Sequence, residues 1–177
     1  MAAYLGWYHE FWSSTVPERF LVPVQSSLTS LSLGGDVYTI TGTFNINDRY
    51  FPQLVSLKLR HMVFSKFHAV EAFVVKHKAT LRGLELEDNG IDLEDVAYYW
   101  TEVWERFQTE LTLLEKLVVR KTDCTAGRCC QPYIRLDAWI FKIEETAREQ
   151  KEDADALEKF QATVELRNPP TAWTVSG

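Results

Sequence analysis

Residues 81–91 have the sequence Leu81-Arg82-Gly83-Leu84-Glu85-Leu86-Glu87-Asp88-Asn89-Gly90-Ile91, in which three leucines are spaced L-x-x-L-x-L and an asparagine follows three positions later. The same spacing recurs at 28–33, 54–59 and 114–119. In the copy at 114–119, Val119 replaces the last leucine. The copies begin at residues 28, 54, 81 and 114, so they are 26, 27 and 33 residues apart. A pattern that recurs at a nearly constant period predicts one structural unit repeated along the chain.

This spacing is typical of leucine-rich repeats, in which each unit is a short strand followed by a helix and neighbouring units stack. Ser65 is expected to cap a helix that runs to about Lys78, and Asp92 a longer helix that accounts for the last step. The apolar positions with helical spacing are Phe67, Val70, Phe73 and Val74 in the first helix and Val96, Tyr99, Trp100, Val103, Trp104 and Phe107 in the second. Asn89 is expected to turn inward and bond backbone groups that are left unpaired where the strand bends away.

The alternation of strands and helices predicts an α/β fold: a short leucine-rich-repeat-like solenoid with parallel strands on its concave face and helices on its convex face. The alternative is an ordinary α/β domain with leucine-rich strands. We divide the chain into an aromatic N-terminal cap helix and connector (1–27), the leucine-rich-repeat-like units (28–135), and a C-terminal helical cap and tail (136–177).

Both ends of the chain are expected to cover the open ends of the stack. Within 1–27, an aromatic-rich helix over 1–15 precedes a connector over 16–27; the alternative function of these aromatics is to dock another domain. After a loop over 120–135, helical stripes are expected at Leu136, Ile140, Ile143 and Ala147, and again at Leu157, Phe160 and Val164. The charged run 148–155 is either part of one helix or a break between two helices. The helix that contains Leu157, Phe160 and Val164 is expected to end at Asn168-Pro169-Pro170.

The composition argues against several classes of protein. A net charge of −6 without a Lys/Arg cluster predicts no nucleic-acid partner, and no apolar run approaches the length of about 20 residues that spans a membrane. The first residues lack the features of a signal peptide. The loop 120–135 contains an odd number of cysteines, Cys124, Cys129 and Cys130. An odd number favours reduced thiols and a cytoplasmic or nuclear location. The alternative is that these cysteines act as a redox sensor.

The sequence contains no recognisable catalytic constellation. It has no G-x-S-x-G, P-loop, G-x-G-x-x-G or H-E-x-x-H motif, and the cysteine spacing does not match a zinc site. The four histidines, His9, His61, His68 and His77, are scattered and are expected at the surface or in packing. We therefore expect no catalytic, cofactor-binding or metal-binding residues, and a protein that is not an enzyme.

The residues between the ladder leucines are expected to share the concave face. Aligning the copies places Lys58 beside Glu85 and Arg60 beside Glu87, with Arg120 next after Glu87. These charges form either a cross-strand ladder of ion pairs that sets the register or a mixed-charge strip that binds a partner. The candidate partner-binding strip consists of Ser32, Ser56, Lys58, Arg60, Glu85, Glu87, Lys116 and Arg120.

Two stretches carry a family resemblance. The first runs from Phe51-Pro-Gln-Leu-Val-Ser-Leu-Lys-Leu through His77-Lys-Ala-Thr-Leu-Arg-Gly-Leu-Glu-Leu-Glu-Asp, and the second is Trp100-x-x-Val-Trp-Glu-Arg-Phe-x-x-Glu-Leu-x-x-Leu-Glu-x-Leu. Together, over about residues 50–120, they resemble the C-terminal part of fungal F-box proteins. The resemblance implies a substrate receptor of a ubiquitin ligase, in which an F-box binds the ligase adaptor and the repeats hold the substrate.

We therefore expect a protein–protein interaction domain, and the resemblance suggests the substrate-recognition part of an F-box-type receptor. Its expected partners are a protein substrate and, through the resemblance, the ligase adaptor. No F-box is recognisable in these residues, so the alternative is a stand-alone repeat scaffold or competitor without a ligase role. A second alternative is an enzyme of unknown type. The unpaired edge strands of an open sheet leave the oligomeric state undecided.

Overall fold

The computed structural model describes residues 11–34, 49–65, 70–92, 98–120, 133–137, 140–144 and 147–168. Several predicted features lie outside these ranges: most of the N-terminal helix, Phe67, His68, Val96 and the three cysteines. Among the described residues, no helix has both the length and the apolar character needed to span a membrane.

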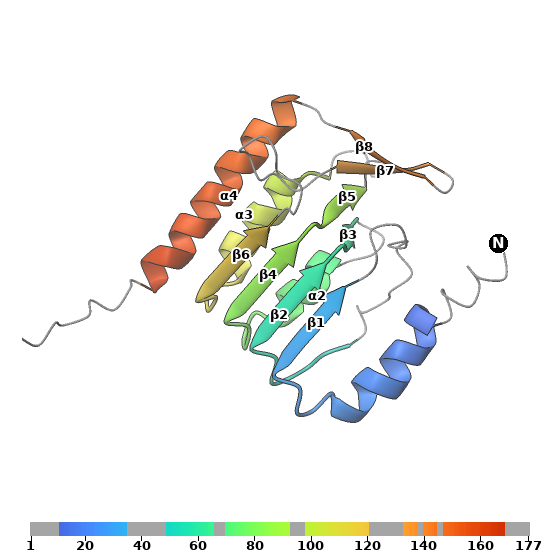
Figure 1. Cartoon of the computed structure of the whole chain (residues 1–177). Helices are drawn as coiled ribbons and strands as arrows, with labels where there is room; N and C mark the ends of the chain where they lie inside the picture. Colours follow the sequence, from blue (N-terminus) through green and yellow to red (C-terminus); the bar gives the residue numbers. More distant parts are fainter. Residues whose placement is uncertain are drawn as a thin grey trace, which may run out of the picture.

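A four-stranded parallel sheet forms the centre of the molecule (Figure 1). Its strands are β1 (Ser30–Gly34), β2 (Ser56–Arg60), β4 (Gly83–Glu87) and β6 (Lys116–Arg120), in the order β1-β2-β4-β6. The register aligns the ladder positions of successive copies, so that Leu31, Leu57, Leu84 and Leu117 form one row and Leu33, Leu59, Leu86 and Val119 the next. The α/β class with parallel strands is confirmed, whereas the solenoid itself stays a prediction.

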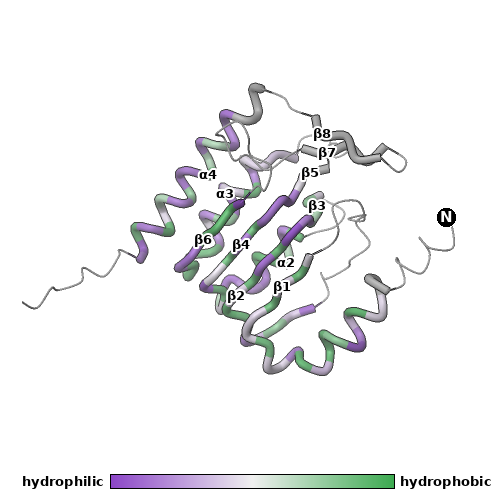
Figure 2. Tube along the Cα trace, viewed as in Figure 1, coloured by the Kyte–Doolittle hydropathy of each residue, from purple (hydrophilic) through white to green (hydrophobic). Residues whose placement is uncertain are grey.

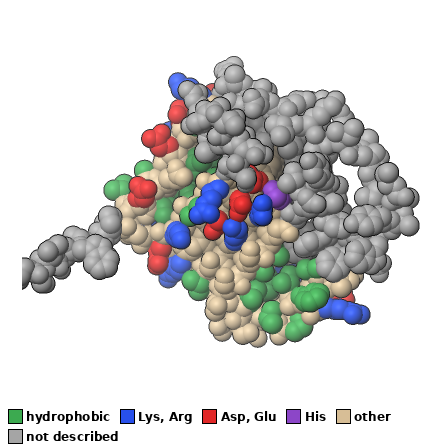
Figure 3. All heavy atoms as spheres, in the orientation of Figure 1, with side chains coloured by type: hydrophobic (Ala, Val, Ile, Leu, Met, Phe, Trp, Pro, Cys, Tyr) green, Lys and Arg blue, Asp and Glu red, His purple; other side chains and the backbone are tan. Residues whose placement is uncertain are grey.

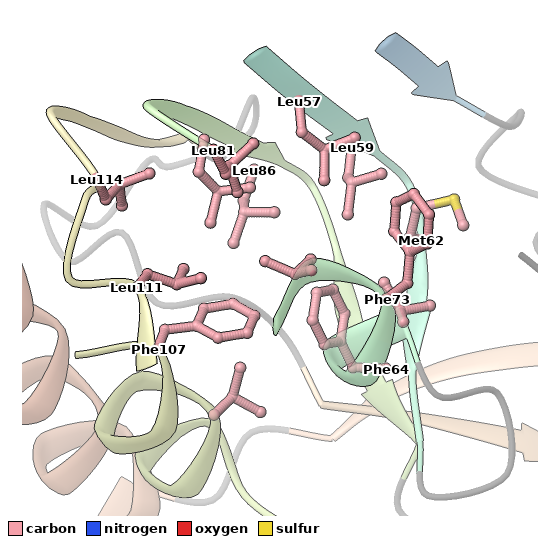
Figure 4. Close-up of a cluster of buried hydrophobic side chains, with 14 of the residues drawn as sticks. Leu57, Leu59, Met62, Phe64, Phe73, Leu81, Leu86, Phe107, Leu111 and Leu114 are labelled. Atoms are coloured by element: carbon pink, nitrogen blue, oxygen red, sulfur yellow. The ribbon is translucent and has the colours of Figure 1, made fainter. Parts of the chain in front are cut away.

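The helices α2 (Val70–Lys76) and α3 (Trp100–Glu110) lie behind this sheet (Figure 1). The predicted stripes are confirmed at Val70, Phe73, Val74, Trp100, Val103, Trp104 and Phe107, which are buried. Tyr99 is the exception, because it is half-buried and lies before the first residue of α3. α3 is the longer of the two helices, as expected from the 33-residue step. In Figure 4 the strand leucines Leu57, Leu59 and Leu86 point toward Phe64, Phe73 and Phe107, and this layer forms the core.

The helix start predicted at Asp92 is wrong, and the residues between Ser65 and the described part of α2 lie outside the described ranges. Asp92 is the last residue of a strand, and α3 begins at Trp100 after Tyr99, whose backbone is extended. The described part of α2 begins at Val70, and Ser65 follows a short strand that the sequence analysis missed. The N–H of Thr101 instead donates to Oδ1 of Asp153, at 2.8 Å, and Asp153 belongs to another helix. A cap from a distant residue satisfies the same unpaired N–H groups as a local one, and nothing in the local sequence marks it.

A second sheet contains β3 (Val63–Phe64), β5 (Gly90–Asp92), β7 (Tyr133–Asp137) and β8 (Ile140–Glu144). β7 pairs antiparallel with β8, so the helical stripe predicted from Leu136 to Ile143 is wrong, and so is the end of the predicted loop 120–135. Residues 133–144 are rich in β-branched and aromatic side chains, which favour strands, and a run this short fits the helical and strand periods equally well.

The ends of the chain also differ in part from expectation. The helical segment η1 (Phe11–Leu21) and the short η2 (Val22–Val24) occupy most of the predicted connector, and Val16 and Leu21 are buried in the core. α4 (Ala147–Arg167) is one continuous helix through the charged run 148–155. It ends directly before Asn168-Pro169, as expected, because the residue before a proline avoids the helical conformation. The predicted burial of Leu157, Phe160 and Val164 is confirmed.

Candidate binding surface

The face of the main sheet turned away from α2 and α3 is built by alternation of side chains along each strand. In β1 and β2 the ladder leucines are buried and the residues between them are exposed or half-buried, and β4 alternates in the same way. Figure 2 shows hydrophilic positions along β2 and β4 on an otherwise leucine-rich sheet. On β1, β2 and β4 the outer face is therefore polar because the inner face takes the leucines. In β6 the burial does not alternate, and the half-buried Val118 lies between Lys116 and Arg120.

All eight residues of the predicted strip lie on this outer face, and we call the set the charged face: Ser32, Ser56, Lys58, Arg60, Glu85, Glu87, Lys116 and Arg120. Figure 3 shows acidic and basic side chains gathered over the middle of the sheet. The register pairs Lys58 with Glu85, Arg60 with Glu87, and Glu87 with Arg120. The location of these residues is as predicted, and a partner-binding role stays a prediction.

Ion pairs connect the charged side chains across three strands. Nζ of Lys58 lies 2.9 Å from Oε1 of Glu85 and 2.7 Å from Oε2 of Glu87. Nε of Arg60 lies 3.3 Å from Oε1 of Glu87. Nη1 of Arg120 lies 3.5 Å from Oε1 of Glu85, so Arg120 reaches diagonally to Glu85 although the register places it beside Glu87. The sequence alignment predicted the direct pairs and missed both diagonal ones, because long side chains lean along the strand.

The ion pairs also hold the charges in place against changes in pH. Hydrogen bonds to Glu87 and then to Glu85 raise the pKa of Lys58 above its ordinary value. The hydrogen bond from Lys58 is the main cause that lowers the pKa of Glu85. Lys58 and Glu85 therefore stay charged throughout the neutral range, and neither is poised for proton transfer.

The side of the charged face nearer β1 carries small residues. Ser30, Ser32 and Gly34 occupy the exposed positions of β1, and Ser56 and Gly83 lie opposite each other on β2 and β4. A Cβ added at Gly34 would lie 3.3 Å from the Cβ of Arg60, so the Arg60 side chain begins in close contact with the Gly34 backbone. The charged face therefore carries short side chains on the β1 side and long charged side chains toward β6.

Two residues at the ends of the strands were missed by the sequence analysis. His61 and Asp88 follow β2 and β4 and have positive φ angles of 54° and 49°, which few non-glycine residues adopt. Nε2 of His61 lies 3.7 Å from Oδ2 of Asp88. Both residues lie at the turns that end these strands, beside the charged face. His and Asp adopt positive φ angles more often than most non-glycine residues, and this is the weak signal that could have identified the turns.

His77 is a packing residue, as expected. It is fully buried, Nε2 accepts the N–H of Phe51 at 3.0 Å, and Nδ1 lies 2.8 Å from the carbonyl oxygen of Phe73. Burial lowers the pKa of His77. In the part of the chain that is described, no three His, Cys, Asp or Glu residues lie close enough together to hold a metal ion.

A comparison of this chain with protein-family models, with curated proteins and with solved structures finds no match.

Proposed function

We propose that this chain is a protein–protein interaction domain that holds a partner on its charged face. The observation that carries the proposal is the assembly of eight polar and charged residues, from four separate strands, into one continuous surface tied by ion pairs. A preorganised surface of this kind loses little conformational freedom when a partner binds.

We also propose that the main sheet belongs to a leucine-rich-repeat-like solenoid with strands on the concave face and helices on the convex face. Support comes from the identical backbone bonding at the start of successive strands. The carbonyls of Thr29, Val55 and Arg82 each accept two consecutive N–H groups of the next strand, at 2.7 to 3.0 Å. Asn89 bonds backbone groups at the strand end in the way expected of such repeats.

The family resemblance over about residues 50–120 extends the proposal to the substrate-recognition part of an F-box-type ubiquitin ligase receptor. Its stretches correspond to β2, α2, β4, α3 and β6, so the resemblance and the charged face involve the same segments. On this proposal the charged face holds the protein that is to be ubiquitinated. A stand-alone scaffold would use the same surface without the ligase.

The test is affinity capture from a fungal lysate with three forms of the chain: the wild type, Arg60→Glu/Arg120→Glu, and the matched control Lys76→Glu/Lys78→Glu. The control reverses the same amount of charge on the helix side, where Lys78 pairs with Glu110 at 2.7 Å. Circular dichroism first establishes that all three forms fold. We expect proteins captured by the wild type and the control to be lost with the charged-face variant.

Each outcome decides one part of the proposal. Ligase adaptor and cullin among the captured proteins would support the receptor role, and their absence would favour the stand-alone scaffold. Capture that is equal for all three forms would contradict the placement of the binding surface on the charged face.

A further inference from the structure

The charged face is cationic on a chain that is acidic as a whole. It carries the four cations Lys58, Arg60, Lys116 and Arg120 and the two carboxylates Glu85 and Glu87, a net charge of +2, whereas the whole chain has a net charge of −6. The sequence showed no basic cluster because the four cations come from two strands, β2 and β6, which are far apart in the sequence.

The exposed part of the face is more cationic than the residue count suggests. The side chains of Glu85 and Glu87 are only 26% and 17% exposed, because both are turned onto Lys58. The side chains of Arg60 and Arg120 are 47% and 63% exposed. Lys116 is also exposed, and none of the described carboxylates forms an ion pair with it. A partner that approaches the face therefore meets guanidinium and ammonium groups first.

The spacing of the two arginines fits an extended peptide. Arg60 and Arg120 occupy the same register row on either side of Glu87, so their strands are two spacings apart, about 10 Å. A peptide in the extended polyproline II conformation has three residues per turn and rises about 3.1 Å per residue, so side chains at positions i and i+3 lie on the same side about 9 Å apart. Two carboxylates at that spacing can each receive paired N–H groups from one guanidinium. The small residues Ser32 and Gly34 on the β1 side leave room for the chain to continue.

We infer that the charged face binds an acidic peptide segment of a partner protein, with carboxylates three positions apart placed over Arg60 and Arg120. The inference rests on the proposed function and adds the chemistry of the partner. A nucleic acid is the less favoured polyanion, because Glu85 and Glu87 lie between the cations and repel a continuous row of phosphates.

The test uses fluorescence anisotropy with a labelled peptide of repeated Glu-Ser-Ser units, the same peptide with Gln in place of Glu, and a labelled oligo-dT. We expect the Glu peptide to bind at least about tenfold more tightly than the Gln peptide, and its affinity to fall with added salt. Arg60→Gln/Arg120→Gln should weaken binding about tenfold or more, as expected for the loss of charge-assisted pairs. The matched control Lys76→Gln/Lys78→Gln should stay within about twofold.

Lys116→Gln provides a second variant that disturbs none of the ion pairs described above, and a few-fold loss of affinity for the Glu peptide is expected. Equal binding of the Glu and Gln peptides, or tighter binding of the oligonucleotide, would overturn the inference. If peptide binding fails while capture from the lysate still depends on Arg60 and Arg120, the proposed function stands and the acidic partner is wrong. If both fail, the charged face is not a binding surface.

Discussion

Replacing Asn89 with alanine should remove a large share of the stability of the protein. Asn89 is fully buried between the ends of neighbouring strands, where Oδ1 accepts the N–H of Met62 at 2.8 Å and Nδ2 donates to the carbonyl of Leu59 at 3.1 Å. Alanine would remove both hydrogen bonds from these buried backbone groups, and each such loss costs about 1–3 kcal/mol. The expected loss is therefore about 2–6 kcal/mol of a total that is typically about 5–15 kcal/mol.

Urea unfolding followed by tryptophan fluorescence measures this loss, since Trp100 and Trp104 are buried and stack on each other. With a slope of about 2 kcal/mol per molar urea, the midpoint should fall by about 1–3 M. The control is Asn168→Ala: Asn168 is exposed, and its Nδ2 donates to the carbonyls of Val164 and Leu114 at 3.3 and 3.4 Å. A midpoint for Asn89→Ala that matches the control would refute the assignment of Asn89 as the residue that satisfies the strand ends.

Three further predictions concern buried polar groups. Because burial lowers the pKa of His77 in the folded state, the unfolded chain binds a proton more readily. The contribution of His77 to the unfolding free energy should be fully present above about pH 6.5 and should fall as the pH drops below it. Urea titrations of His77→Gln should lack this part of the pH dependence. Asp153→Ala should lower the unfolding free energy by about 1 kcal/mol, as for other lost helix caps. Asparagine keeps the acceptor oxygen, so thermal melts in which Asp153→Asn loses as much as alanine would contradict capping by the side-chain oxygen. Tyr98→Phe removes a hydroxyl that donates to the buried carboxylate of Glu71 and should cost about 1–3 kcal/mol in urea unfolding, with no loss expected if the carboxylate is fully satisfied by Arg106.

The main sheet was predictable because its information is local. Each L-x-x-L-x-L copy places leucines on one side of a strand and polar residues on the other, and a slip of one residue between neighbouring copies would expose the leucines. The direct pairs of the charged face followed from that alignment, and the inward turn of Asn89 followed from the repeat architecture that the third copy indicates.

The errors fall where distant segments supply the partner. β7 and β8 satisfy each other's backbone groups as an antiparallel pair, while the sequence from Leu136 to Ile143 fits a helical stripe equally well. α3 begins at Trp100 rather than after Asp92, and the Thr101 N–H finds its acceptor in Asp153, which is 52 residues away. Local propensity is weak compared with the free energy of satisfying buried backbone groups, so the tertiary partner decides.

The parallel leucine ladder and the residues of the charged face can be read from the amino-acid pattern, because side-chain alternation and repeat spacing act within a few residues of each position. The start of α3, the second sheet and the diagonal ion pairs became visible in the folded chain. These ion pairs turn Glu85 and Glu87 onto Lys58 and leave the arginines exposed. These features depend on groups far apart in the chain, whose bonding has no trace in the local pattern and exists only once the chain is folded.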